Sequence, residues 1–200
     1  IRLTPQAQAD IRASRFDALY FGTLIQRAPE SRASLRQIAA DCRPETVFCD
    51  VNLRPGCYDA ESVRFCLEQA TVLKVSMEEE PALRALGLYA VTGDTPRGIA
   101  RALAERFGQL RTVLLTLGKD GAYGYRTENG EDCFQPAVGE RVVSTVGAGD
   151  SFSAAWLTAH LSGEPLADCM RKAALVSGFV VAHTEAVPEY PASLYDALRK

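Results

Sequence analysis

Short apolar runs alternate with longer stretches in which apolar residues recur at helical spacing. The short runs are rich in branched side chains and predict β-strands. The longer stretches predict helices, and in one of them Ile99, Leu103 and Phe107 recur every four residues and form an apolar face. This alternation is typical of an α/β fold with a mainly parallel sheet. The predicted strands cover residues 16–20, 47–51, 71–75 and 112–117, and the predicted helices cover 31–41, 59–69, 78–86 and 95–107.

The pattern changes after residue 117. Three glycines within residues 118–124 and a polar run at 128–131 predict turns on either side of a strand. An antiparallel return strand would then include Val142 and Val143. Two long helical stretches follow, at 150–161 and 166–183. The length and the absence of a repeat or linker favour a single domain over residues 1–200.

Composition narrows the class of protein. The 22 basic and 25 acidic residues give a net charge of −3 and are scattered, which argues against binding to nucleic acid or to an anionic membrane. No run approaches the roughly 20 apolar residues of a membrane span. The six cysteines lack C-x-x-C spacing and only two histidines are present, so we expect buried thiols in a cytoplasmic protein and no zinc site.

The candidate chemistry lies in a glycine turn that leads into a predicted helix. Gly147 and Gly149 allow a sharp turn, and the amides at the following helix start can bind an anion. Asp150 lies in the first helical turn, where the helix dipole favours a carboxylate. It could take a proton from a hydroxyl while the amides stabilise a phosphoryl group. A simple capping turn remains the alternative, because a lone Gly-x-Gly is a weak signal.

Other nucleotide-binding and hydrolase motifs are missing from the sequence. It contains no G-x-x-x-x-G-K-[ST] and no G-x-S-x-G, and the third glycine of G-x-G-x-x-G is absent after residues 147–149. A dinucleotide-dependent oxidoreductase is therefore disfavoured.

Four segments, in order, resemble the ribokinase-like (PfkB) carbohydrate kinases. Residues 144–152 resemble the C-terminal signature D-T-x-G-A-G-D-x-F, and residues 116–122 match T-x-G-x-x-G-A. Residues 74–79 occupy the place of K-x-N-x-x-E. Residues 50–54 are similar to the D-x-N-x-R of fructokinase-like members.

The resemblance implies a three-layer α/β fold, with a mainly parallel central sheet flanked by helices, and transfer of the γ-phosphoryl group of ATP to a primary hydroxyl of a fructose-like ketose. It also implies roles for individual residues. These are Asp150 as catalytic base with Gly147, Ala148 and Gly149 as the anion hole, Thr116, Gly118 and Gly121 as ATP contacts, Asp50, Asn52 and Arg54 as substrate contacts, and Glu79 in the outer shell of Mg²⁺.

The sequence departs from the family pattern in several places. Ser144 replaces an Asp of the monovalent-cation site, Ser76 replaces an Asn, and Glu185-Ala186 stands where Gly-Ala is common. We therefore expect a weak response to K⁺, and a catalytically silent relative that binds nucleotide or a partner is the alternative. Nothing before Phe16 resembles the family's N-terminal strands and lid, so we expect those strands and that lid to be missing. The chain would then be incomplete at its N-terminus or a remnant. The expected partners are a sugar and ATP, with a homodimer left open.

Overall fold

The computed structural model describes residues 1–91, 93–139 and 141–199. Contacts between residues group the chain into two compact units. The first comprises Ile1–Leu115 and Tyr125–Gly130, and the second comprises Thr116–Gly124 and Glu131–Lys200. The single kinase domain expected over residues 1–200 stays a prediction.

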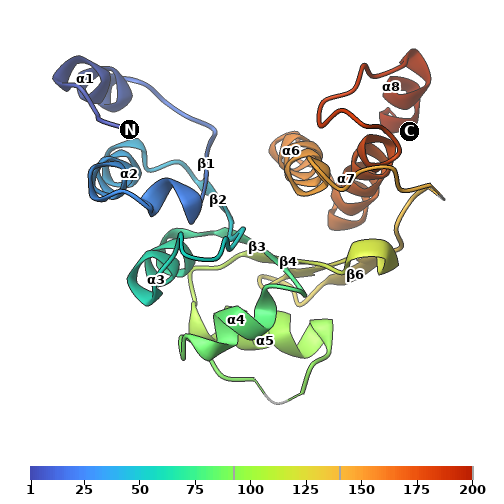
Figure 1. Ribbon diagram of the computed structural model, residues 1–200, viewed down its shortest axis with the longest axis horizontal. Helices are drawn as coiled ribbons and strands as arrows, with labels where there is room; N and C mark the ends of the chain where they lie inside the picture. The colour runs from blue at the N-terminus through green and yellow to red at the C-terminus, as the bar shows by residue number, and fades with distance from the viewer. Residues whose placement is uncertain (92, 140, 200) are drawn as a thin grey trace. The chain divides into compact units, whose positions relative to one another are not determined.

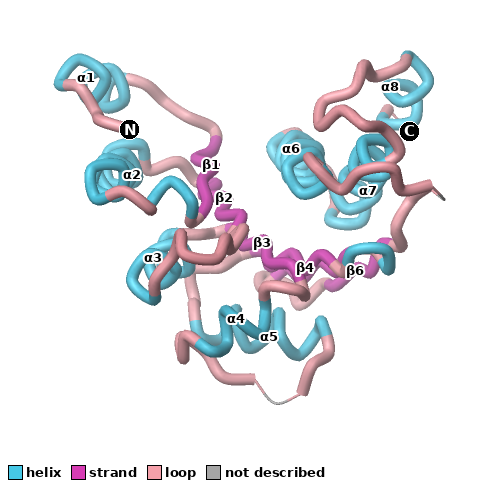
Figure 2. The backbone as a smooth tube through the Cα atoms, in the orientation of Figure 1, coloured by secondary structure: helices cyan, strands magenta, loops and turns pink. Residues whose placement is uncertain are grey.

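The described residues form one sheet, whose strand order β1-β2-β3-β4-β5-β6 follows the chain. Figure 2 draws the strands in magenta. β1 pairs in parallel with β2, and β2 in parallel with β3. The α/β fold predicted from the hydrophobic pattern is confirmed. The strands are β1 (Ala18–Gly22), β2 (Thr46–Asp50), β3 (Val72–Ser76), β4 (Thr112–Thr116), β5 (Ala122–Arg126) and β6 (Asp132–Gln135).

Three helices of the first unit begin at side-chain caps. The side chains of Thr4, Asp59 and Thr95 accept backbone amides at the starts of α1, α3 and α5. The apolar face predicted for the last of these helices is confirmed, because Ile99 and Leu103 are fully buried. The helical segments are α1 (Pro5–Ala13), η1 (Leu24–Gln26), α2 (Pro29–Cys42), α3 (Ala60–Gln69), α4 (Glu80–Ala85) and α5 (Pro96–Arg106), labelled in part in Figure 1.

The second unit is built mainly on two packed helices, α6 (Ala148–Leu161) and α7 (Leu166–Val181). Trp156 of α6 and Met170 of α7 are fully buried, and α7 also contacts β6. The 3₁₀ helix η2 (Gly118–Asp120) follows β4, and α8 (Ala192–Leu198) contacts α7. No helix in the described part of the chain is long and apolar enough to cross a membrane.

Some expectations about secondary structure were wrong. Val142 and Val143 are not in a strand, because the amides of Val143 and Ser144 both donate to the Val181 carbonyl at the end of α7, at 2.7 and 3.2 Å. A carbonyl in the last turn of a helix has no donor within the helix, so the Val181 carbonyl is free to accept these amides, which a strand would otherwise use for pairing. β1 begins two residues later than predicted, at Ala18. The helix α1 was not predicted, because it buries no residue and its sequence has no strong apolar period.

Candidate functional site

A buried ion pair lies at the carboxyl end of the parallel strands. Asp50 is the last residue of β2, and strand register places it beside Lys74 of β3. Lys74 Nζ is 2.6 Å from Asp50 Oδ2, and both side chains are only 6% exposed. The Tyr20 hydroxyl donates to the same carboxylate oxygen at 3.4 Å. The Asp50 carboxylate is therefore compensated by charge inside the protein, as a buried carboxylate requires.

After β2 the chain enters an unusual backbone conformation. Asn52 has φ of 42°, in the left-handed region that non-glycine residues rarely adopt. The amide of Val51 donates to the Lys74 carbonyl at 3.0 Å. The hydroxyl of the fully buried Thr23 donates to the Val51 carbonyl at 2.8 Å and lies 3.2 Å from the Asn52 carbonyl. This loop is therefore tied to both β1 and β3, and it carries the exposed Arg54.

Glu79 connects this loop to the start of α4. Its Oε1 accepts the Leu53 amide at 2.5 Å, and its Oε2 accepts the Ser76 amide at 2.9 Å. In return, the Glu79 amide donates to the carbonyl and the hydroxyl of Ser76, at 3.0 and 3.2 Å. The structure thus brings together Glu79 and the segment that contains Asp50, Asn52 and Arg54.

The contacts of Glu79 bear on its predicted place near Mg²⁺. A carboxylate offers about four lone-pair sites, so two amide bonds leave room for metal-bound water. The described residues contain no group of three or more His, Cys, Asp or Glu side chains that could hold an ion. Nucleotide-bound Mg²⁺ often takes only one or two protein carboxylates and keeps several waters. The place of Glu79 in the outer shell of Mg²⁺ stays a prediction.

In the second unit, the motif at residues 116–122 forms a tight turn between β4 and β5. Gly118 has φ of 57° and Gly121 has φ of 119°. A Cβ on Gly121 would lie 2.1 Å from the carbonyl oxygen of Gln135, so only glycine fits. The Leu117 amide donates to the Gly121 carbonyl at 2.8 Å and closes the turn. Thr116 precedes the turn as the last residue of β4.

The other glycine turn leads into α6. Gly147 has φ of 83°, and a Cβ there would lie 2.7 Å from the Ala186 carbonyl oxygen. The Ser151 amide makes the first intrahelical bond, to Gly147 at 2.9 Å. The amides of Gly149 and Asp150 fall in the first turn, which has no intrahelical acceptor for them. Together with the dipole of a helix of 14 residues they form the kind of site that binds phosphate.

Asp150 itself is exposed in the first turn of α6. Its exposure leaves its carboxyl group accessible to a substrate hydroxyl. The segment that packs on Gly147 contains Glu185, whose own amide and then the Thr184 hydroxyl lower the pKa of that carboxyl. The departure at Glu185 therefore adds a negative charge to the segment beside the anion-binding turn.

The predicted residues fall into two sets, one in each unit. The first unit holds Asp50, Asn52, Arg54 and Glu79, and the second holds the two glycine motifs and Asp150. Sequence reasoning assigned no role to Thr23 or Lys74. A lysine inside the apolar run of β3 was a usable signal for a buried ion pair, whereas nothing local marks Thr23.

Residues 4–192 match the pfkB family of carbohydrate kinases. Among curated relatives, the chain is 36% identical to ribokinase of Schizosaccharomyces pombe over 88 residues, which are 44% of this chain and 27% of that protein. It is 29% identical to 2-dehydro-3-deoxygluconokinase of Haemophilus influenzae over 151 residues, 72% of this chain and 44% of that protein. An ATP-dependent 6-phosphofructokinase of Thermoanaerobacterium thermosaccharolyticum is 28% identical over 185 residues, 86% of this chain and 53% of that protein.

Solved structures agree with this match. The fold resembles fructokinase from Vibrio cholerae with a TM-score of 0.78 at 22% identity, covering 96% of this chain and 64% of that one. It resembles aminoimidazole riboside kinase from Salmonella enterica with a TM-score of 0.71 at 25% identity, covering 91% and 62%. The chain spans between 27% and 53% of the lengths of the three curated relatives named above. Because the match extends over nearly the whole chain, the chain belongs to the pfkB family of carbohydrate kinases.

Proposed function

We propose that the protein containing this chain is an ATP-dependent sugar kinase that phosphorylates a primary hydroxyl of a fructose-like ketose. The observation that carries the proposal is the glycine turn into α6, with an exposed Asp150 in the first helical turn. The segment at residues 50–54 favours a ketose. The fold likeness to a fructokinase crystallised with fructose and ADP supports the same sugar class.

The residues of the second unit would act on the nucleotide and on the reacting hydroxyl. The turn formed by Gly147, Ala148 and Gly149 would act as the anion hole. It would present the amides at the start of α6 to the negative charge of the transferring phosphoryl group. The Asp150 carboxylate would accept the proton as the hydroxyl oxygen bonds to phosphorus and the bond to the ADP oxygen breaks. Thr116, Gly118 and Gly121 would contact ATP.

The residues of the first unit would hold the sugar. Asn52 and Arg54 offer hydrogen-bond donors to the hydroxyl groups of the sugar. Asp50, paired with Lys74 at the end of β2, would be the third substrate contact. Mg²⁺, when bound with ATP, neutralises phosphate charge, and Glu79 would orient water in its outer shell.

The test is a coupled assay of ADP release across a panel of sugars. The panel contains fructose, ribose and 2-dehydro-3-deoxy sugar acids, because relatives are named for the latter two kinds. The protein assayed is this chain and the longest natural protein that contains it. Asp150→Asn should lower turnover by about 10² to 10⁴-fold, the usual size for a general base, with little change in ATP affinity. Asp196→Asn, at an exposed carboxylate of the same unit, is the matched control.

A second function is favoured by the substitutions Ser144 and Ser76. A silent relative would bind ATP, measured by calorimetry, without sugar-dependent ADP release. In that case the Asp150→Asn protein and the wild type would behave alike. Near-normal turnover by Asp150→Asn in an active protein would instead refute the assignment of the base.

A further inference from the structure

The loop that joins β2 to α3 contains a residue in the left-handed region. Asn52 lies at φ of 42°, a region that asparagine enters more readily than other non-glycine residues but in which its surroundings must hold it to give a single conformation. The next residues include the exposed Arg54. Hydrogen bonds and an ion pair at the two ends of the loop hold its backbone in this conformation.

At the start of the loop, two side chains from elsewhere in the sequence bind backbone atoms. The Thr23 hydroxyl lies 2.8 Å from the Val51 carbonyl, in the peptide group before Asn52, and 3.2 Å from the Asn52 carbonyl, in the peptide group after it. Glu79 accepts the Leu53 amide of that second peptide group at 2.5 Å. The peptide groups on both sides of Asn52 are thus bound, the first by a fully buried hydroxyl and the second by the same hydroxyl and a carboxylate.

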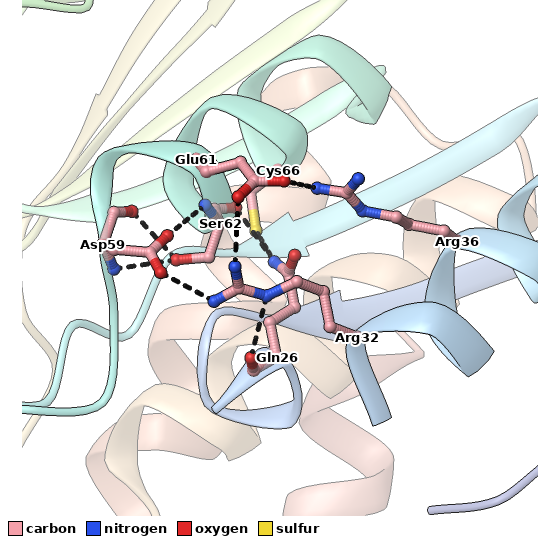
Figure 3. A network of polar contacts seen from close by, with 7 residues as sticks. All are labelled: Gln26, Arg32, Arg36, Asp59, Glu61, Ser62 and Cys66. Carbon is pink, nitrogen blue, oxygen red and sulfur yellow. Dashed lines mark hydrogen bonds and ion pairs between the residues drawn. The ribbon is translucent and has the colours of Figure 1, made fainter. Parts of the chain in front are cut away.

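At the far end, the loop stops at Asp59, the N-cap of α3 (Figure 3). Asp59 accepts the Ser62 amide at 2.7 Å and pairs with Arg32 of α2, also at 2.7 Å. Gln26 of η1 donates to the Ser62 carbonyl at 2.9 Å, and Arg32 donates to the Gln26 carbonyl at 3.1 Å. The segment that begins with Thr23 therefore braces the far end as well.

We infer that Thr23 and Glu79 are positioning residues for the sugar. They hold Asn52 in its left-handed conformation and thereby present Asn52 and Arg54 to the substrate. The inference rests on the proposed function, since it assumes that these two residues contact sugar. It gives Glu79 a second task besides its place near Mg²⁺, and it assigns a role to Thr23, which lies outside every recognised motif.

The size of the effect follows from the population of the competent loop. Loss of one buried hydrogen bond costs enough to lower that population about tenfold, and the apparent affinity falls by the same factor. The effect falls on the sugar, because ATP is assigned to residues of the other unit.

Thr23→Val removes the hydroxyl and keeps the shape, whereas Thr23→Ser keeps the hydroxyl. In the 200-residue chain, hydrogen exchange at the Leu53 amide should accelerate about fivefold or more in Thr23→Val and in Glu79→Gln. In the longest natural protein, Thr23→Val should raise the apparent KM for the sugar about tenfold and leave the KM for ATP within about twofold. Thr23→Ser should restore both values.

Two matched controls separate positioning from general damage. Thr112→Val alters an equally buried threonine at the amino end of β4, and Glu78→Gln alters the exposed neighbouring carboxylate. Neither should change Leu53 exchange or the sugar KM. If Thr23→Val does not fold, hydrogen exchange at the Leu53 amide in Glu79→Gln still tests the inference.

Unchanged Leu53 exchange in folded Thr23→Val and Glu79→Gln proteins would overturn the inference. So would accelerated exchange with an unchanged sugar KM, because the contacts would then serve stability alone. If the wild type phosphorylates no sugar, the proposed function fails, and Leu53 exchange still decides whether Thr23 and Glu79 hold the loop.

Discussion

Two regions that carry different parts of the proposed chemistry reach their shapes in opposite ways. They are the loop at residues 51–59 of the first unit, here called the strand-end loop, and the glycine turn of the second unit. In the loop, Asn52 has a left-handed conformation. The backbone around it is held by the buried Thr23 hydroxyl, the half-buried Glu79 carboxylate and the backbone carbonyl of Lys74. The turn at residues 147–150 uses glycine, which adopts the left-handed region freely, and the carboxylate of its Asp150 is exposed.

This difference teaches where each region is vulnerable. A glycine turn is specified locally, so it is damaged mainly by changes to its own residues. The strand-end loop is specified by distant partners, and one of them, Thr23, lies outside every motif, so the loop can be damaged by a change that motif comparison would not select.

The largest expected effect on stability would come from breaking the buried ion pair. Lys74→Met leaves the Asp50 carboxylate buried without its cation, which costs about 3–5 kcal/mol of unfolding free energy. Arg111→Met removes an exposed pair with Glu45 and should cost less than about 1 kcal/mol. Urea unfolding measures both. If Lys74→Met and Arg111→Met lose equal unfolding free energy, the buried pair contributes no more than an exposed one, and the strand end does not depend on it.

A smaller effect sharpens the glycine side of the comparison. Gly121 and Gly130 both have positive φ, but only Gly121 would place a Cβ against backbone, 2.1 Å from the Gln135 oxygen. Gly130→Ala should cost about 1 kcal/mol from strain alone. Gly121→Ala should cost a further 1–3 kcal/mol, approximately, from overlap. Thermal unfolding of the two variants separates the cost of backbone strain from the cost of steric overlap. Equal losses of stability would show that the backbone moves and relieves the overlap at residue 121.

Asp59, at the far end of the strand-end loop, predicts that the stability of the protein depends on pH. The Ser62 amide and then Arg32 lower the pKa of Asp59 to about 2, from 3.8. A lowered pKa means that the stabilisation is complete above pH 3.8 and is lost as the pH falls towards 2. Because the Asp59 side chain is 53% exposed, solvent screening reduces the loss to about 1 kcal/mol.

Asp59→Asn keeps the cap and removes the titration, so it serves as the control. Its stability curve between pH 5 and pH 2 should be flatter than that of the wild type. Parallel curves would show that Asp59 contributes nothing to acid unfolding.

The smallest expected effect concerns monovalent cations. Ser144 supplies no carboxylate beside the glycine turn, so K⁺ should change activity by less than about twofold, compared with a large organic cation. Ser144→Asp should increase the response. Strong K⁺ activation of the wild type would show that other groups complete a cation site.

The sequence predicted much of the fold because hydrophobic period is a local property. Alternating apolar runs placed β2, β3 and β4 within one residue of their observed bounds, and four-residue spacing identified the buried face of α5. It also located the glycine turns, since a positive φ selects glycine at the residue itself. The fold class and the conformation of these turns were therefore determined by the sequence alone.

Tertiary structure decided which groups meet. Asp50 and Lys74 are 24 residues apart and pair only because the parallel register aligns them. Glu79 reaches the Leu53 amide 26 residues away, and Thr23 reaches Asn52 from the end of β1. Val142 and Val143 have the apolar pattern of a strand, yet the amides of Val143 and Ser144 donate to the Val181 carbonyl. Such outcomes depend on competition among donors and acceptors that come together only after the chain has folded, and local sequence does not encode that competition.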